Sequence, residues 1–128
     1  MPPLRLWYFG TSPMSSPVID WINELTDGTP IGQSRYDICR TLIEQLERSG
    51  SDLRRPTSAP LGGGLYELRG SDRQGTPVRL IFAFAGTGRA LLLAGCVKRS
   101  AGEFERAKSV AARRLVQFKA DPIGHTFR

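Results

Sequence analysis

Four short apolar runs along the chain predict β-strands. They are bounded by glycine, proline or polar turn residues, as strands usually are, and they lie at residues 4–9, 65–69, 78–85 and 90–97. Alternate residues of a strand point to opposite faces. In the third run this separates Arg79, Ile81 and Ala83 from Val78, Leu80, Phe82 and Phe84. The fourth run is apolar throughout, which favours a central place in a sheet.

Three other segments carry apolar residues at helical spacing. The first, residues 17–25, follows Ser16 and begins with Pro17, which are a typical N-cap and first helical residue. After a turn predicted for residues 26–32, a second helix is expected at residues 33–48. The third helix, at residues 103–120, has a core stripe made of Phe104, Ala107, Ala111, Leu115 and Phe118.

The order of these elements predicts a single α+β domain over residues 1–128. One strand and two helices come first, then a loop at residues 51–64, a three-stranded meander and a C-terminal helix. We expect the two N-terminal helices to pack on a twisted, mainly antiparallel sheet of about four strands. The loop glycines 62–64 lack the Lys–Ser/Thr pair of a phosphate-binding P-loop, so they indicate only a flexible lead into the next strand.

The composition is that of an ordinary soluble protein, with 40% hydrophobic and 23% charged residues. Since no apolar run has the length of a membrane span and the N-terminus lacks a signal-peptide pattern, we expect a cytoplasmic protein with no membrane partner. Cys39 and Cys96 are expected to be buried and reduced. The single histidine, His125, is expected in a solvated tail. No metal or other cofactor is predicted, and Ser/His/Asp hydrolysis is rejected.

Positive charge is concentrated in the later part of the chain. Residues 1–50 carry four Arg against six Asp and Glu, a net charge of −2, whereas residues 98–128 carry eight Lys and Arg against three acids, a net of +5. A basic face of this kind attracts polyanions through phosphate contacts and counterion release. The alternative is that surface arginines serve only solubility.

Four basic side chains on the predicted strands are candidates for chemistry. Arg69 ends one strand, Arg79 lies within the next, and Lys98 and Arg99 follow the last. If these strands are neighbours, the four side chains converge; otherwise they are separate solvated strand ends. Attack of a ribose 2′-hydroxyl on the adjacent phosphodiester builds negative charge on phosphate oxygens, which fixed Arg and Lys donors stabilise without a metal.

The run LGGGLYELRG, the strand VRLIFAF and the stretch RALLLAGCVKRSAGEFERAKSVAARR together resemble the RelE/HigB superfamily. The similarity covers roughly residues 60–114 and is greatest to the phage-derived HigB-like branch. It implies a RelE-like fold and a toxin of a type II toxin–antitoxin system that cleaves mRNA on the ribosome. It also implies a helix-turn-helix antitoxin as partner.

The resemblance assigns roles to individual residues. Arg79 stands at the family's catalytic mid-sheet arginine, Lys98 and Arg99 at its basic pair, and Arg69 at the arginine of the ELR motif. Two departures concern catalysis. Tyr66 and Glu67 occupy the positions of strand lysines thought to activate the 2′-hydroxyl, and Phe104 is the nearest residue to a tyrosine that the family uses.

Two roles stay open for Glu67, which either acts as the general base or only pairs with a neighbouring arginine. Tyr66 offers a face for stacking on RNA, and Arg106 and Arg113, outside the core stripe of the last helix, are expected to bind RNA. Two other functions are compatible with the sequence: a non-catalytic RNA- or ribosome-binding module, and a phage assembly protein. Trp21 is either a core residue or an anchor for the antitoxin.

Overall fold

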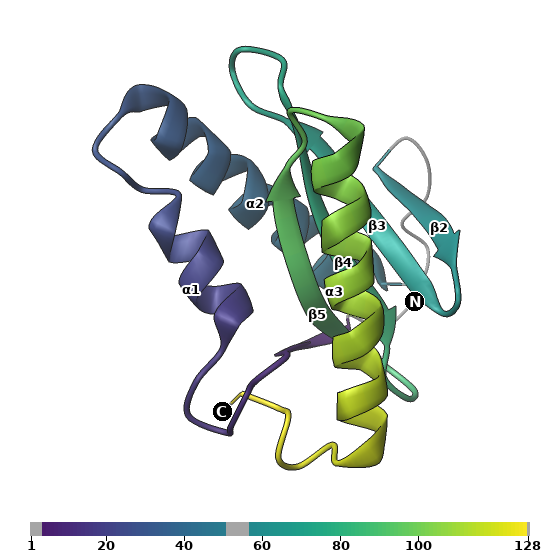
Figure 1. The fold of residues 1–128 in the computed structure, drawn as a ribbon. Helices are drawn as coiled ribbons and strands as arrows, with labels where there is room; N and C mark the ends of the chain where they lie inside the picture. The colour runs from purple at the N-terminus through teal and green to yellow at the C-terminus, as the bar shows by residue number, and fades with distance from the viewer. Residues whose placement is uncertain (1–3, 51–56, 128) are drawn as a thin grey trace.

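The computed structural model describes residues 4–50 and 57–127 and has an α+β architecture (Figure 1). The elements follow one another in the order β1 (Arg5–Tyr8), α1 (Pro17–Glu24), α2 (Pro30–Ser49), β2 (Ser58–Gly62), β3 (Leu65–Ser71), β4 (Pro77–Phe84), β5 (Arg89–Val97) and α3 (Ala101–Ala120). None of the helices in this described part is long and apolar enough to cross a membrane.

All five strands form one sheet in the order β1-β5-β4-β3-β2, in which only β1 pairs with its neighbour in a parallel manner. The apolar strand β5 therefore lies between β1 and β4, as its composition predicts. The expectation of about four strands and of a loop over residues 51–64 was wrong in one respect, because Ser58–Gly62 is a strand. Pro60 argues against a strand in the sequence, but β2 is an edge strand, where proline is tolerated. Of the rest of the expected loop, residues 57, 63 and 64 are in turns, and residues 51–56 lie outside the described residues.

Two helices begin earlier than their apolar patterns indicate. In α2, the hydroxyl of Thr29 accepts a hydrogen bond from the Gly32 amide at 3.1 Å, and Pro30 takes the first helical position. The predicted turn at residues 26–32 is correspondingly shorter. In α3, the hydroxyl of Ser100 accepts from the Glu103 amide at 3.3 Å. Both starts repeat the N-cap hydroxyl that marks the start of α1, and α2 also repeats its proline at the first helical position.

The helices cover the two faces of the sheet. Gly70 of β3 lies so close to α2 that an added Cβ would be 2.7 Å from the Ile38 side chain. On the other face, the α3 residue Phe118 packs near Trp7 of β1, with ring centroids 6.4 Å apart. Figure 1 shows α3 crossing the front of the sheet and α2 behind it. The predicted core stripe of α3 is confirmed, since all five of its residues are buried.

The C-terminal tail is bound to β1, so the expectation of a solvated His125 was wrong. The backbone of residues 125–127 hydrogen-bonds to Tyr8 and Gly10. Nδ1 of His125 lies 2.9 Å from the Gly10 carbonyl oxygen, and its ring stacks on Phe9 at 5.2 Å between centroids. His125 is thus packed against the chain rather than exposed in a free tail. Cys39 and Cys96 are buried free thiols, as predicted.

Candidate functional site

Two arginines face one another across strands β3 and β4. Arg69 is directly opposite Arg79, and Cys96 of β5 is opposite Arg79 on the other side. Directly opposed residues share a face of a sheet, and here it is the α3 face. Two neighbouring guanidinium groups repel each other, so the arrangement requires a compensating anion.

Glu67 supplies that anion. It lies two residues before Arg69 on the same face of β3, and its Oε1 is 3.2 Å from Nε of Arg69 and 3.8 Å from Nε of Arg79. The carboxylate is buried, which strengthens its interaction with both cations. The pairing that the sequence left as one of two roles for Glu67 is therefore present.

Arg79 is held more firmly than Arg69. Its Nη1 donates hydrogen bonds to the carbonyl oxygens of Gly70 at 3.0 Å and Val78 at 3.1 Å. Its side chain is 11% exposed, compared with 37% for Arg69. Burial lowers the pKa of Arg79, which Glu67 opposes, yet an arginine stays protonated at neutral pH. The result is a fixed cation whose orientation is set before any ligand arrives.

Lys98 continues the same face beyond the end of β5. Its amide donates to the Pro77 carbonyl oxygen at 2.7 Å, which ties it to the start of β4. Its Nζ lies 5.1 Å from the ring centroid of Phe104, near the start of α3. Burial and the charge of Glu103 raise the pKa of the Cys96 thiol, while the charges of Arg79 and Lys98 lower it, so both cations are close enough to act on the same atom. We call Glu67, Arg69, Arg79 and Lys98 the basic cluster.

Arg99 and Arg106 lie next to the basic cluster, on the side of α3 that faces α1. Nη2 of Arg99 is 3.5 Å from Oε2 of Glu103, one turn into α3. Arg99, Glu103 and Arg106 line a cavity of about 390 Å³ that reaches Trp21. Arg113 is exposed two helical turns beyond Arg106. The predicted convergence therefore holds for Arg69, Arg79 and Lys98, with Arg99 adjoining.

Tyr66 is separated from these residues. It is paired with Phe82 on the opposite face of the sheet, and their rings stack with centroids 5.6 Å apart. Phe84, at the end of β4, contacts Tyr66 edge-on at 5.1 Å. The alternation of β3 thus gives Glu67 to the basic cluster and Tyr66 to an aromatic group on the α2 side.

The family model of the phage-derived Gp49-like proteins (DUF891) matches residues 21–117, which include the whole basic cluster. The chain belongs to the Gp49-like family. This is a family of RelE/HigB-like toxins, in agreement with the resemblance seen in the sequence. A comparison with curated proteins finds no match.

Two residues of this Gp49-like chain that the sequence did not single out adjoin the basic cluster. Nζ of Lys108 is 5.7 Å from the ring centroid of Phe104, the same ring that Lys98 contacts. Glu103 pairs with Arg99. The signal for both was helical spacing, since Lys108 follows Phe104 by four residues and Glu103 follows Arg99 by four.

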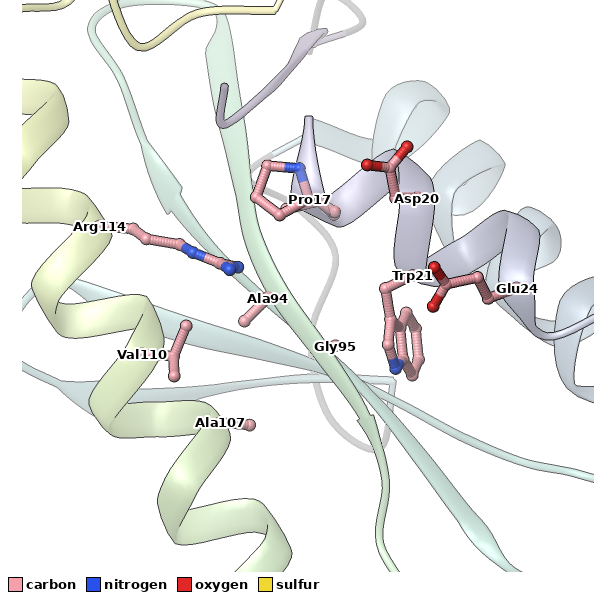
Figure 2. A pocket seen from close by; sticks show the side chains of 10 residues that line it. Pro17, Asp20, Trp21, Glu24, Ala94, Gly95, Ala107, Val110 and Arg114 are labelled. Carbon is pink, nitrogen blue, oxygen red and sulfur yellow. The ribbon is translucent and has the colours of Figure 1, made fainter. Parts of the chain in front are cut away.

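A groove lies between α1 and α3 in the Gp49-like fold (Figure 2). Its cavity of about 420 Å³ has Asp20, Trp21 and Glu24 of α1 on one wall and Arg114 of α3 on the other, with Gly95 of β5 between them. Gly95 makes room for the indole, because an added Cβ would overlap the Trp21 ring. Trp21 is half-buried, so it is both packed and accessible.

Proposed function

We propose that this protein is the toxin of a type II toxin–antitoxin system, an endoribonuclease that cleaves mRNA on the ribosome without a metal. The observation that carries the proposal is the Glu67-oriented pair of Arg69 and Arg79, with Lys98 on the same face. Membership of the Gp49-like family supports the toxin class.

The proposed reaction is attack of a ribose 2′-hydroxyl on the adjacent phosphorus. The 2′-oxygen loses its proton to a base and bonds to phosphorus, and the bond to the 5′-oxygen breaks as that oxygen takes up a proton from an acid or from water. The products are a 2′,3′-cyclic phosphate and a 5′-hydroxyl end. Negative charge grows on the non-bridging oxygens and on the leaving oxygen, and preorganised cations stabilise it because they need no reorientation during the step. Arg79 has this property, and Arg69, Lys98 and Arg99 add charge around it.

Glu67 has a clear role as a positioning residue for Arg79 and Arg69. A carboxylate in this position also has the chemistry of a general base. Positioning follows from the two ion pairs, whereas proton transfer requires contact with the substrate hydroxyl. The two roles give different pH–rate profiles when Glu67 is substituted.

The test is induced expression with and without the neighbouring open reading frame, followed by mapping of RNA 5′ ends. We expect growth arrest, new mRNA ends bearing 5′-hydroxyl groups, and relief of both by a helix-turn-helix antitoxin. Cleavage of ribosome-bound mRNA by the purified protein should persist when EDTA lowers free Mg²⁺ to the minimum that keeps the ribosome intact. Arrest without new RNA ends would contradict the proposal.

A second candidate function is binding of RNA or the ribosome without cleavage. It is favoured by Phe104, which has no hydroxyl, and by the hydrogen bonds of Arg79 to two backbone carbonyls, which suit a structural arginine. This candidate predicts ribosome association and slowed translation with intact mRNA. The same 5′-end mapping therefore separates it from the nuclease.

A further inference from the structure

Two lysine ammonium groups lie against the ring of Phe104. The Nζ atoms of Lys98 and Lys108 lie 5.1 Å and 5.7 Å from its ring centroid, both within cation–π range. One lysine comes from the end of β5 and the other from the second turn of α3, so the sheet and the helix each contribute one. The buried ring fixes both cations in the same small area of the surface.

This area borders the basic cluster. Lys108 lies on the side of α3 that faces β3. Leu115 is two turns further along the same side, and its side chain lies 3.9 Å from where a Cβ added to Gly64, directly before β3, would be. Lys98 shares its face with Arg79 through the alternation of β5. The row of cations therefore continues from Arg69 through Arg79 to Lys98 and Lys108.

The charge of this pair of lysines is only partly compensated. Within the described residues, the ion pairs include none for Lys98 and one for Lys108, in which Nζ is 3.3 Å from Oε1 of the exposed Glu105. An exposed pair of this kind contributes little to folding stability and yields readily to a stronger anion. Two like charges held on one ring repel each other, and an anion between them removes that repulsion.

We propose that Lys98 and Lys108, held on Phe104, form a second phosphate-binding subsite, which takes the RNA phosphate next to the one at Arg79. This inference rests on the proposed function, because it assigns the neighbouring phosphate of the same substrate. A polyanion with regularly repeated charges fits a row of cations better than a single carboxylate does. Ammonium groups act as point charges toward phosphate and do not read base sequence, so the subsite contributes affinity and position but no sequence preference.

The experiment measures binding of a 2′-O-methyl oligoribonucleotide, which the protein does not cleave, across a range of salt concentrations. Lys108→Ala is compared with Lys119→Ala, a matched loss of one exposed lysine from the last turn of the same helix. We expect Lys108→Ala to lower the slope of log K against log salt by about 0.7, the value for one phosphate contact on a single strand. Lys119→Ala should leave it unchanged. Glu105→Gln should strengthen binding, since it frees Lys108.

Cleavage kinetics give a second readout. Loss of a contact made equally in the ground and transition states raises KM and leaves kcat unchanged, so Lys108→Ala should do this and Lys108→Arg should restore KM. If wild-type protein binds and cleaves RNA but Lys108→Ala behaves like Lys119→Ala, the subsite is overturned and the proposed function stands. An oligoglutamate peptide is added as a competitor for the oligoribonucleotide. If the only effect of Lys108→Ala is that this peptide no longer competes, the site binds an acidic protein segment instead of RNA. Absence of both RNA binding and cleavage of ribosome-bound mRNA by the wild type would overturn both proposals.

Discussion

Oε1 of Glu67 lies between two guanidinium groups, 3.2 Å from Nε of Arg69 and 3.8 Å from Nε of Arg79. The three side chains share one face because Glu67 and Arg69 are two residues apart along β3 and Arg79 is paired with Arg69. The carboxylate therefore does more than neutralise charge. It holds two arginines side by side that would otherwise repel each other, and a phosphate approaching them meets donors already in place.

Arg79→Ala should abolish growth arrest and lower cleavage roughly 100- to 1,000-fold, the usual effect of removing one charge-stabilising donor. Arg79→Lys should recover only part of the activity, because an ammonium group cannot contact Glu67 and two carbonyl oxygens in the same geometry. The measurement is single-turnover cleavage of ribosome-bound mRNA by purified protein.

The control for this change is Arg48→Ala, which removes an exposed arginine from the last turn of α2, on the other face of the sheet. Circular dichroism and thermal unfolding should establish that each variant is folded. If folded Arg79→Ala retains wild-type cleavage, Arg79 is a structural residue that only secures Gly70 and Val78.

Glu67→Gln should lower kcat with little change in KM, because Gln can still accept one hydrogen bond but no longer balances the charge of both arginines. The pH–rate profile then separates the two roles of Glu67. A positioning residue leaves the shape of the profile intact at a lower rate, whereas loss of the acidic limb identifies the general base. Unaltered kcat in a folded variant would exclude both roles.

The sequence predicted the basic cluster better than the boundaries of the fold. Alternation along β4 placed Arg79 on the face of the sheet that its phenylalanines do not occupy. The meander β3–β4–β5 made Arg69, Arg79 and Lys98 neighbours. Both follow from local periodicity and short connections. The edge strand β2 was missed because Pro60 and three glycines look like a loop, and only the neighbouring β3 makes that segment a strand.

Side-chain partners from distant elements could not be predicted in the same way. The contact of Phe104 with Lys98 depends on the angle at which α3 leaves β5, which no local pattern encodes. His125 was expected in solvent because it is near the chain end, yet the tail pairs with Phe9, which directly follows β1 near the other end of the sequence. Tertiary packing decided these cases, as it does wherever a contact spans the chain.

Cys39 should make folding stability fall at alkaline pH. Burial raises the pKa of its thiol to about 12 in the folded protein, from an ordinary value near 9. The folded state thus holds a proton that the unfolded state loses, so its contribution is complete below pH 9 and decreases as the pH rises toward 12. The expected loss is at most about 1.4 kcal/mol per pH unit. Urea unfolding of wild type and Cys39→Ala between pH 8 and 10.5 measures it, and parallel curves for the two proteins would contradict the prediction.

Trp21 connects the groove to the question of inhibition. Its ring packs over Gly95 of β5 and lines both cavities between α1 and α3, next to Glu24. A half-buried tryptophan with acidic neighbours, on the α1 side of the groove, suits an anchor for the antitoxin. Trp21→Ala should then weaken antitoxin binding more than RNA cleavage.

Because loss of the Trp21 packing also lowers the melting temperature, substitution of the exposed Glu24 by Arg provides the sharper test, with Asp37→Arg on α2 as its control. Calorimetric titration of the antitoxin should show weaker binding for Glu24→Arg and unchanged binding for Asp37→Arg. Equal affinities for the two, or a parallel loss of cleavage and stability in Trp21→Ala alone, would make Trp21 a core residue and place the antitoxin elsewhere.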